Sequence, residues 1–326
     1  MVRLLARYAL LAAAVVLLNF ALPRLLPGDA LDSDASGGMH DAGPTLTVQT
    51  RAQLRAYYHL DQSLSVQFLT YLRDLAHGDL SWSISKAAPV GRLIGERLPW
   101  TLGLVLGSTI VAGISGTLLG LIAGWRGGRY GHVILATSTS LVALPEFLVA
   151  MALLLVLGGC LGWFPLQGGR ATFAPDAGGP GNWLYAARDI SWHLALPALT
   201  LTLASVAAFV LLTCGAVQQV LAEPYLVTAR AKGLPEWRVA VRHAFPNALL
   251  PVLTLFGVRI GQVIGGSIVV ERVFSVPGLG FFTFEAIRSR DYPVLQAVFL
   301  LSSLAVLLVN LAVELAYRRL DPHRTR

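Results

Sequence analysis

Charged residues are scarce in this sequence, and their scarcity limits the classes of protein it can be. Only 13% of the 326 residues are charged, whereas 55% are hydrophobic; a soluble domain carries about a quarter charged residues. The hydrophobic residues gather in long runs, and a run of about 20 is enough for a helix to cross a bilayer. The sequence therefore predicts an all-α, polytopic membrane protein.

Cysteine, lysine and the common catalytic motifs are scarce or missing as well. Cys160 and Cys214 are the only cysteines, and their spacing indicates neither a disulfide framework nor a zinc site. The only lysines, Lys86 and Lys232, lack the glycine before and the Ser or Thr after that a phosphate-binding loop needs. No HExxH or GxSxG occurs. We therefore expect no catalytic residue, no metal site and no cofactor on this chain.

Six apolar segments are long enough to span a membrane as helices, which satisfy their own backbone hydrogen bonds in lipid. Trp and Tyr residues mark several of their ends, as in an interfacial belt. The predicted spans are residues 8–26, 100–124, 133–157, 194–213, 249–270 and 295–317.

The distribution of positive charge predicts the orientation of these spans. With the N-terminus in the cytoplasm, 12 Lys and Arg residues lie in the short inside segments, and the outside segments spread 11 over more than twice the length. The positive-inside rule then places both termini in the cytoplasm. The net charge of +7 is therefore a topology signal, and no basic face for nucleic acid is expected. An uncleaved anchor is expected at the N-terminus, since no small-residue cleavage site follows the first apolar run.

The segments outside the membrane differ in character. Residues 32–50 are rich in Gly, Asp, Ser and Thr and predict a flexible loop, whereas residues 51–60 and 65–75 have helical apolar spacing. Residues 158–192 contain Gly-Gly and Gly-Gly-Pro and are expected to be irregular.

The longest inside segment, residues 223–246, alternates apolar and cationic residues at helical spacing. Gly233 is placed to end one helix in the left-handed conformation, and Pro235 can open the next, with Glu236 in its first turn. The expected shape is helix, tight turn, helix. Its pattern alone fits an amphipathic connector at the lipid surface equally well.

A longer set of motifs resembles the permease subunits of bacterial dipeptide and oligopeptide importers, an ATP-binding-cassette family that includes nickel and glutathione systems. Thr228-Ala-Arg-Ala-Lys-Gly-Leu234 is similar to the coupling motif of this family, although Val227 and Thr228 stand where the wider importer pattern has Glu and Ala. Other pieces follow in the family's order from one end of the chain to the other. They include Leu98-Pro-Trp-Thr-Leu102, Pro145-Glu-Phe147, His193-Leu-Ala-Leu-Pro197, Val270–Gly280, Asp291-Tyr-Pro293 and Leu320-Asp-Pro322.

This resemblance implies a type I importer transmembrane domain of the first-permease type. It implies an N-terminal transmembrane helix over residues 1–28, an extracytoplasmic region with short helices over 29–98, and a permease core over 99–326 with a coupling helix at about 223–245. The coupling helix would dock on a separate ATPase, with Tyr225, Leu226 and Leu234 as apolar anchors. The residues implied in coupling are Glu223, Tyr225, Leu226, Thr228, Ala229, Arg230, Ala231, Lys232, Gly233, Leu234, His243 and Pro246.

The partners also follow from the resemblance. They are a second homologous permease subunit, one or two ATP-binding subunits that hold ATP and Mg, an extracytoplasmic substrate-binding protein, and the lipid bilayer of the plasma (inner) membrane. Peptides are the expected substrate, with nickel or glutathione as alternatives. A membrane enzyme is disfavoured by the missing motifs, and an autonomous carrier by the lack of a clear internal repeat.

Ionisable residues within spans usually face a cavity or a partner. Glu146 and Arg259 either line the pathway or pair with each other, and Glu314 near a span end snorkels or pairs. Glycines at four-residue intervals, Gly116/Gly120/Gly124 and Gly257/Gly261/Gly265, predict smooth faces for helix packing. The pathway or gate candidates are Pro145, Glu146, Arg259, Gly261, Gly265 and Glu271.

Overall fold

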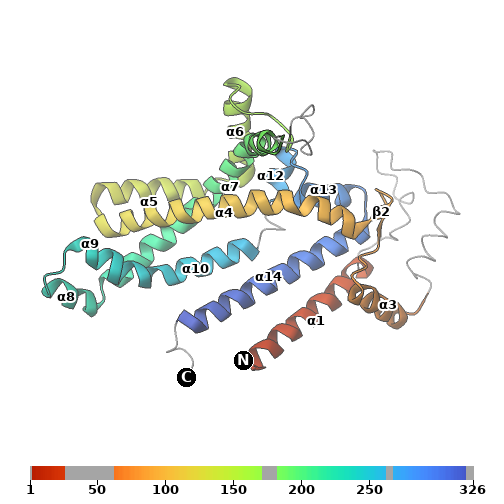
Figure 1. The fold of residues 1–326 in the computed structure, drawn as a ribbon, viewed down its shortest axis with the longest axis horizontal. Helices are drawn as coiled ribbons and strands as arrows, with labels where there is room; N and C mark the ends of the chain where they lie inside the picture. Colours follow the sequence, from red (N-terminus) through yellow and green to blue (C-terminus); the bar gives the residue numbers. More distant parts are fainter. Residues whose placement is uncertain (1, 26–61, 171–181, 262–266, 321–326) are drawn as a thin grey trace. The chain divides into compact units, whose positions relative to one another are not determined.

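The computed structural model describes residues 2–25, 62–170, 182–261 and 267–320 (Figure 1). The predicted loop 32–50, the predicted helix 51–60, Gly265 and the Leu320-Asp-Pro322 motif beyond Leu320 lie outside the described residues. The chain forms two units, residues 1–98 with 282–304 and residues 99–281 with 305–326. Each unit is described by itself.

The first unit contains the N-terminal helix, a second short helix and a small β-hairpin. It comprises α1 (Val2–Leu25), α3 (Leu64–Ala76), the strands β1 (Trp82–Ser83) and β2 (Ala88–Pro89), and the adjoining parts of α4 (Val90–Arg126), α13 (Leu279–Arg288) and α14 (Tyr292–Leu320). Asn19 on α1 donates a 2.9 Å hydrogen bond to the Gln296 carbonyl on α14, and the rings of Phe20 and Phe68 meet at 5.0 Å. The predicted helix 65–75 is confirmed by α3.

A buried carboxylate holds the small β-hairpin in place. The two strands pair antiparallel, with Ser83 opposite Ala88. Asp291, which is fully buried, accepts hydrogen bonds from the hydroxyl of Ser83 at 2.5 Å and from the amide and hydroxyl of Ser85 at 2.9 and 2.7 Å. Lys86 adds an ion pair to Glu285 at 3.4 Å. The Asp291-Tyr-Pro motif therefore anchors the hairpin beside the start of α14.

The second unit is built around α7 (Asn182–Leu221), which packs against α5 (Gly128–Val142), α6 (Glu146–Leu153) and α10 (Phe245–Gly261). A π-helical turn, η1 (Leu154–Cys160), extends α6, and α12 (Ile268–Val273) packs against α6. The glycine face of α4 lies against α7. A Cβ atom added at Gly120 would lie 2.6 Å from the carbonyl oxygen of Val210. This confirms close packing through the Gly116/Gly120/Gly124 row.

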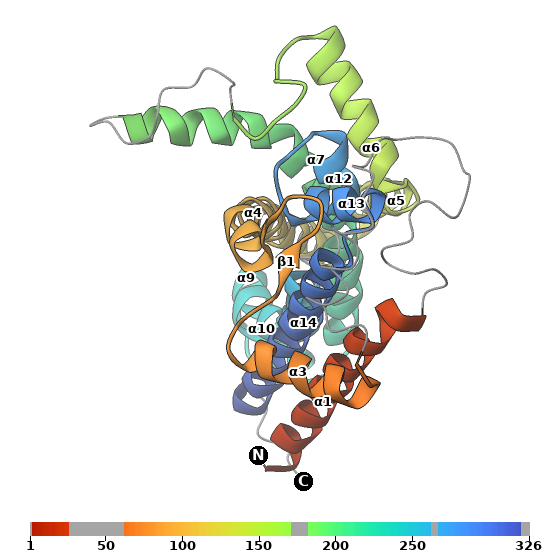
Figure 2. The same ribbon diagram turned by 90° about the vertical axis from the view of Figure 1, so that its right-hand side faces the viewer.

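Among the described residues, four helices are long and apolar enough to cross a membrane, and two bent helix pairs bring the number to six. The predicted third span, residues 133–157, corresponds to a bent pair of helices, since α5 ends at Val142 and α6 leaves it at 98° (Figure 2). Pro145 explains the break, because it has no amide hydrogen and disfavours helical geometry at Leu144.

The helix α7 is longer than the sequence indicated. It begins at Asn182, so the expectation of an irregular chain up to residue 192 is wrong for its last part. The breaker residues of that loop all precede Asn182, and residues 182–192 contain no Gly or Pro. Nothing in their composition therefore opposes a helix, which starts as soon as the glycine-rich stretch ends.

Candidate functional site

A bent element, residues 223–245, joins α7 to α10. It consists of α8 (Pro224–Ala231), a turn at Gly233, the short α9 (Glu236–Arg238) and the π-helical η2 (Val239–Ala244). Pro224 occupies the first turn of α8, where its missing amide hydrogen costs nothing. The wide turn of η2 directly precedes Pro246, which cannot donate the next helical hydrogen bond.

The turn depends on the backbone of Gly233. Its φ is +76°, in the left-handed region, and its amide hydrogen-bonds to the Arg230 carbonyl at 2.9 Å. Pro235 then precedes α9, and Glu236 lies in its first turn. The predicted helix, tight turn and helix are thereby confirmed.

The two arms of the bent element share a core of their own. Leu226, Ala229, Val239 and Ala244 are buried against one another, and Leu234 packs against them together with Trp125 of α4. Leu226 is fully buried, so the expectation that it anchors a partner from the surface is wrong. Where two amphipathic helices fold back on each other, apolar side chains on their facing sides are buried between them. Burial of Leu226 in this way stabilises the bend.

Hydrogen bonds tie α8 to the start of α10. Asn247 Nδ2 donates to the Tyr225 hydroxyl at 2.7 Å and to the His243 carbonyl at 3.2 Å, and the Tyr225 hydroxyl donates to the same carbonyl at 3.4 Å. His243 thus contributes its backbone to this bracing. These contacts and the shared core connect the bent element firmly to the helices that follow it.

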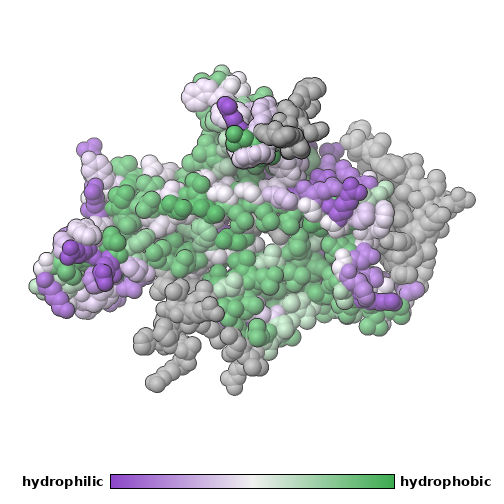
Figure 3. Space-filling model, viewed as in Figure 1, coloured by the Kyte–Doolittle hydropathy of each residue, from purple (hydrophilic) through white to green (hydrophobic). Residues whose placement is uncertain are grey.

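The outer surface of the bent element combines apolar and basic side chains. Tyr225, Val227 and Trp237 are 39%, 63% and 63% exposed. Hydrophilic residues gather over α8 and α9 (Figure 3). The other exposed members of the predicted site are Glu223, Thr228, Arg230, Ala231, Lys232, Gly233 and Pro246, and the exposed cations also include Arg238 and Arg242.

One of these cations is engaged within the chain. Arg230 Nε lies 3.0 Å from Glu236 Oε1 across the turn, and its guanidinium lies 5.9 Å from the Trp125 ring. Among the described residues, Lys232 makes no ion pair within 4.0 Å, in contrast to Arg230. The exposure of Val227 was not anticipated, because the sequence marks that position only as a departure from the importer motif.

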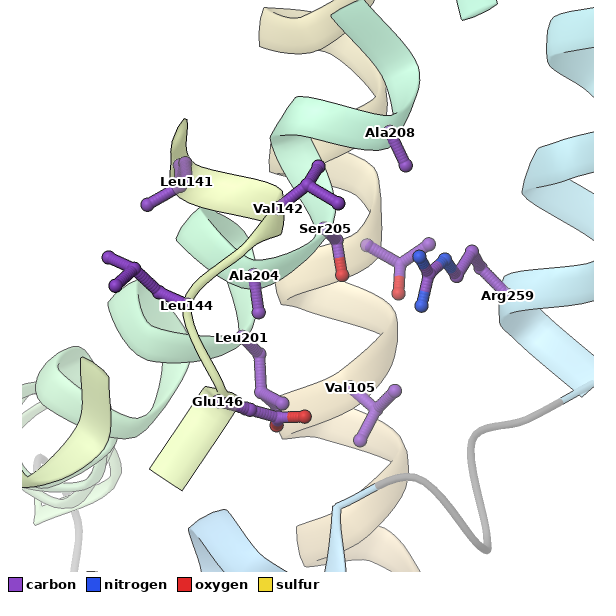
Figure 4. Close-up of a pocket in the computed structure, with 11 residues that line it drawn as sticks. Val105, Leu141, Val142, Leu144, Glu146, Leu201, Ala204, Ser205, Ala208 and Arg259 are labelled. Atoms are coloured by element: carbon purple, nitrogen blue, oxygen red, sulfur yellow. The ribbon is translucent and has the colours of Figure 1, made fainter. Parts of the chain in front are cut away.

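The structure brings the pathway candidates Glu146 and Arg259 to one cavity in the second unit. The cavity has a volume of about 260 Å³ and lies between α4, the α5–α6 break, α7 and α10 (Figure 4). Pro145 immediately precedes α6 and places Glu146 at its first position. Gly261 lies against Val306 of α14 instead of in the cavity. The two charged groups do not form an ion pair within 4.0 Å.

Glu271 lies away from this cavity, in a buried hydrogen-bond cluster beyond the end of α10. Its Oε1 accepts from the hydroxyls of Thr101 and Ser267, each at 2.7 Å, and its Oε2 accepts from the Phe281 amide at 2.9 Å. Thr101 in turn accepts from the Leu279 amide at 2.7 Å. Burial raises the pKa of Glu271 above its ordinary value, and the hydrogen bonds from Phe281, Ser267 and Thr101 act in the opposite direction. Glu271 thus joins three segments of the unit.

Two glycines make room for this carboxylate. A Cβ atom at Gly278 would collide with the Glu271 carboxylate and lie 2.5 Å from the Thr101 hydroxyl, and one at Gly280 would lie 2.7 Å from Ile268 Cα. The Val-Pro-Gly-Leu-Gly stretch, residues 276–280, therefore packs closely around the buried Glu271 carboxylate. Its glycines are required for close approach.

The described helices define a class, the multi-pass helical membrane proteins. Residues 116–326 match the family model of binding-protein-dependent transport system inner membrane components. The chain belongs to this family of ATP-binding-cassette importer permeases.

Relatives match nearly the whole chain. A probable peptide ABC transporter permease protein, y4tP, of Sinorhizobium fredii is 34% identical over 95% of this chain and 94% of its own length. The glutathione transport system permease GsiC of Salmonella choleraesuis is 36% identical over 94% of this chain and 92% of its own length. The oligopeptide transport system permease AppB of Bacillus subtilis is 37% identical, with coverage of 94% and 93%.

Proposed function

We propose that this chain is a pore-forming permease subunit that imports peptides and takes its driving force from separate ATP-binding subunits. The observation that carries the proposal is the bent element. It has a buried core, it is braced to α10, and it presents exposed apolar and basic side chains.

The proposed mechanism uses the bent element as a mechanical link. ATP and Mg bind to the partner subunits and draw them together. Each partner subunit has a cleft, and the cleft that binds Tyr225, Val227 and Trp237 moves with its subunit. Lys232 meets acidic groups there. Docking can shift the equilibrium between two conformations of the permease only if the docked segment makes different contacts in each of them. A bend that is held firmly against the helices can transmit such a difference. The bracing of Tyr225 and Asn247 supports this role.

The proposed topology has both termini in the cytoplasm. The support is the dense positive charge of the short segments on that side, including the bent element with Lys232, Arg238 and Arg242. The bent element then faces the ATP-binding subunits. The second permease subunit and the external binding protein complete the assembly.

Peptides are the proposed substrate, and glutathione is the second candidate. Relatives with peptide, oligopeptide and glutathione permease names resemble this chain about equally, and glutathione is itself a tripeptide. The shared chemistry is a short chain that carries both an ammonium and a carboxylate group. Nickel lacks this chemistry and is the weaker alternative.

The proposal is tested by reconstituting this chain with its ATP-binding subunits, second permease and binding protein in proteoliposomes. We expect ATP-dependent uptake of radiolabelled dialanine or glutathione, and no uptake when ATP is replaced by a non-hydrolysable analogue. Uptake that persists without the ATP-binding subunits would instead indicate an autonomous carrier. Uptake of nickel alone would overturn the peptide assignment.

A further inference from the structure

The cavity in the second unit carries two opposite charges and little else that is ionisable. Glu146 enters it from the start of α6 and Arg259 from α10, on opposite sides (Figure 4). The hydroxyl-bearing residues Thr109 and Ser205 and apolar side chains complete the lining. Both charged residues lie in segments that form the bent membrane spans.

In the part of the chain that the structure describes, Glu146 and Arg259 attract each other electrostatically but make no direct contact. One carboxylate oxygen of Glu146, Oε1, is buried without a hydrogen-bond partner. No ion pair within 4.0 Å joins it to Arg259. Charged groups inside a membrane protein are costly unless a partner or a cavity compensates them. A direct pair would be the simplest compensation, and the structure instead holds the two groups apart across an open space.

The broken span contributes to this arrangement. Discontinuous helices in transporters place backbone and side-chain groups beside substrate sites near the middle of the membrane. Here the 98° break between α5 and α6 exposes the first turn of α6 to the cavity, and Pro145 fixes where that turn begins. The break therefore directs Glu146 into the cavity.

We propose that this cavity is a transit site for a small zwitterion, with Glu146 binding the ammonium group and Arg259 the carboxylate of a dipeptide. The inference rests on the proposed function and narrows its substrate class. A volume of about 260 Å³ lies just below the range of about 300–1,000 Å³ common for ligand pockets, which suits a dipeptide or one end of a longer peptide. A bare divalent cation would be repelled by Arg259.

The test pairs each protein group with the ligand group it is proposed to bind. The whole assembly, without its binding protein, is placed in lipid nanodiscs, and binding of dialanine, N-acetyl-dialanine and dialanine amide is measured by scintillation proximity. The variants are Glu146→Gln and Arg259→Gln, with Arg259→Lys as a charge-retaining variant. Glu96→Gln and Arg92→Gln are matched controls, because these residues pair with each other on an exposed surface.

We expect dialanine to bind at least about tenfold more weakly to Glu146→Gln and to Arg259→Gln, as for the loss of a charge-assisted contact worth about 1.4 kcal/mol. N-acetyl-dialanine lacks the ammonium group, so it should bind to Glu146→Gln as well as to the unaltered assembly. Dialanine amide lacks the carboxylate, so it should bind to Arg259→Gln as well as to the unaltered assembly. Arg259→Lys and both controls should bind dialanine within about threefold of the unaltered assembly.

Three results would overturn the proposal. One is equal weakening of all three ligands by either neutralisation, with melting temperatures unchanged. Another is restored dialanine binding in the double variant Glu146→Arg/Arg259→Glu, which would show that the two residues pair with each other. The third is an assembly that imports dialanine but binds it equally well in every variant. In that case the proposed function stands while the cavity assignment fails.

Discussion

At the scale of single residues, Gly233 is needed for its backbone. Nothing lies within 4 Å of a Cβ added there, yet its φ is +76°. Left-handed geometry costs a residue with a Cβ about 1–2 kcal/mol. We expect Gly233→Val to uncouple ATP hydrolysis from import at normal expression and Gly233→Asn, which tolerates this geometry, to keep most activity. Gly215→Ala in α7, which also meets open space, is the control. Normal import by Gly233→Val would contradict this role.

Thr101 offers a test of the Glu271 cluster. Its hydroxyl donates to Glu271 and accepts from the Leu279 amide, so its removal takes one hydrogen bond from each of these two buried groups. We expect Thr101→Val to lower the free energy of unfolding by about 1–3 kcal/mol and Thr101→Ser to have a much smaller effect. Thermal unfolding in detergent measures both. Thr137→Val, which removes only a hydroxyl bonded within its own helix, should change little, and an equal loss there would refute the account.

At the scale of elements, the glycine row of α4 sets its distance from α7. We expect Gly120→Leu to force the helices apart, since even a Cβ there would meet the Val210 carbonyl and Thr213. Overpacking of this kind costs about 1–3 kcal/mol or more. Gly107→Ala on the same helix faces open space and should be neutral or stabilising. The measurement is the melting temperature of the purified protein, and similar values for the two variants would contradict the packing role.

The sequence predicted those elements whose signal is local. The apolar runs placed α1, α4, α7, α10 and α14, and Gly233 with Pro235 placed the turn of the bent element. The sequence did not predict the break at Pro145, because a proline within an apolar run can kink a span or divide it. It also did not show that Leu226 faces inward, since this depends on how α8 folds back on η2. The sequence indicated that Glu146 and Arg259 either line a pathway or pair with each other, but the choice between these depends on the packing of helices more than 100 residues apart.

At the scale of the whole molecule, the parts described here serve different tasks. The first unit holds its β-hairpin in place through Asp291. The second unit contains the cavity lined by Glu146 and Arg259, and the bent element. The proposed importer requires that movement of the ATP-binding subunits reach the second unit through the bent element. Import therefore depends on contact between the bent element and an ATP-binding subunit.

The most direct measurement is photo-crosslinking from single positions in the intact assembly. A photoreactive amino acid replaces Trp237 on the bent element or Trp163 in the loop after η1, which the predicted topology places on the opposite side of the membrane. The two tryptophans have similar exposure, 63% and 59%. We expect position 237 to crosslink to an ATP-binding subunit, with a yield that changes when ATP is added. We expect position 163 to form no crosslink to that subunit. Failure of position 237 to link to that subunit, in an assembly that still imports substrate, would contradict this role of the bent element.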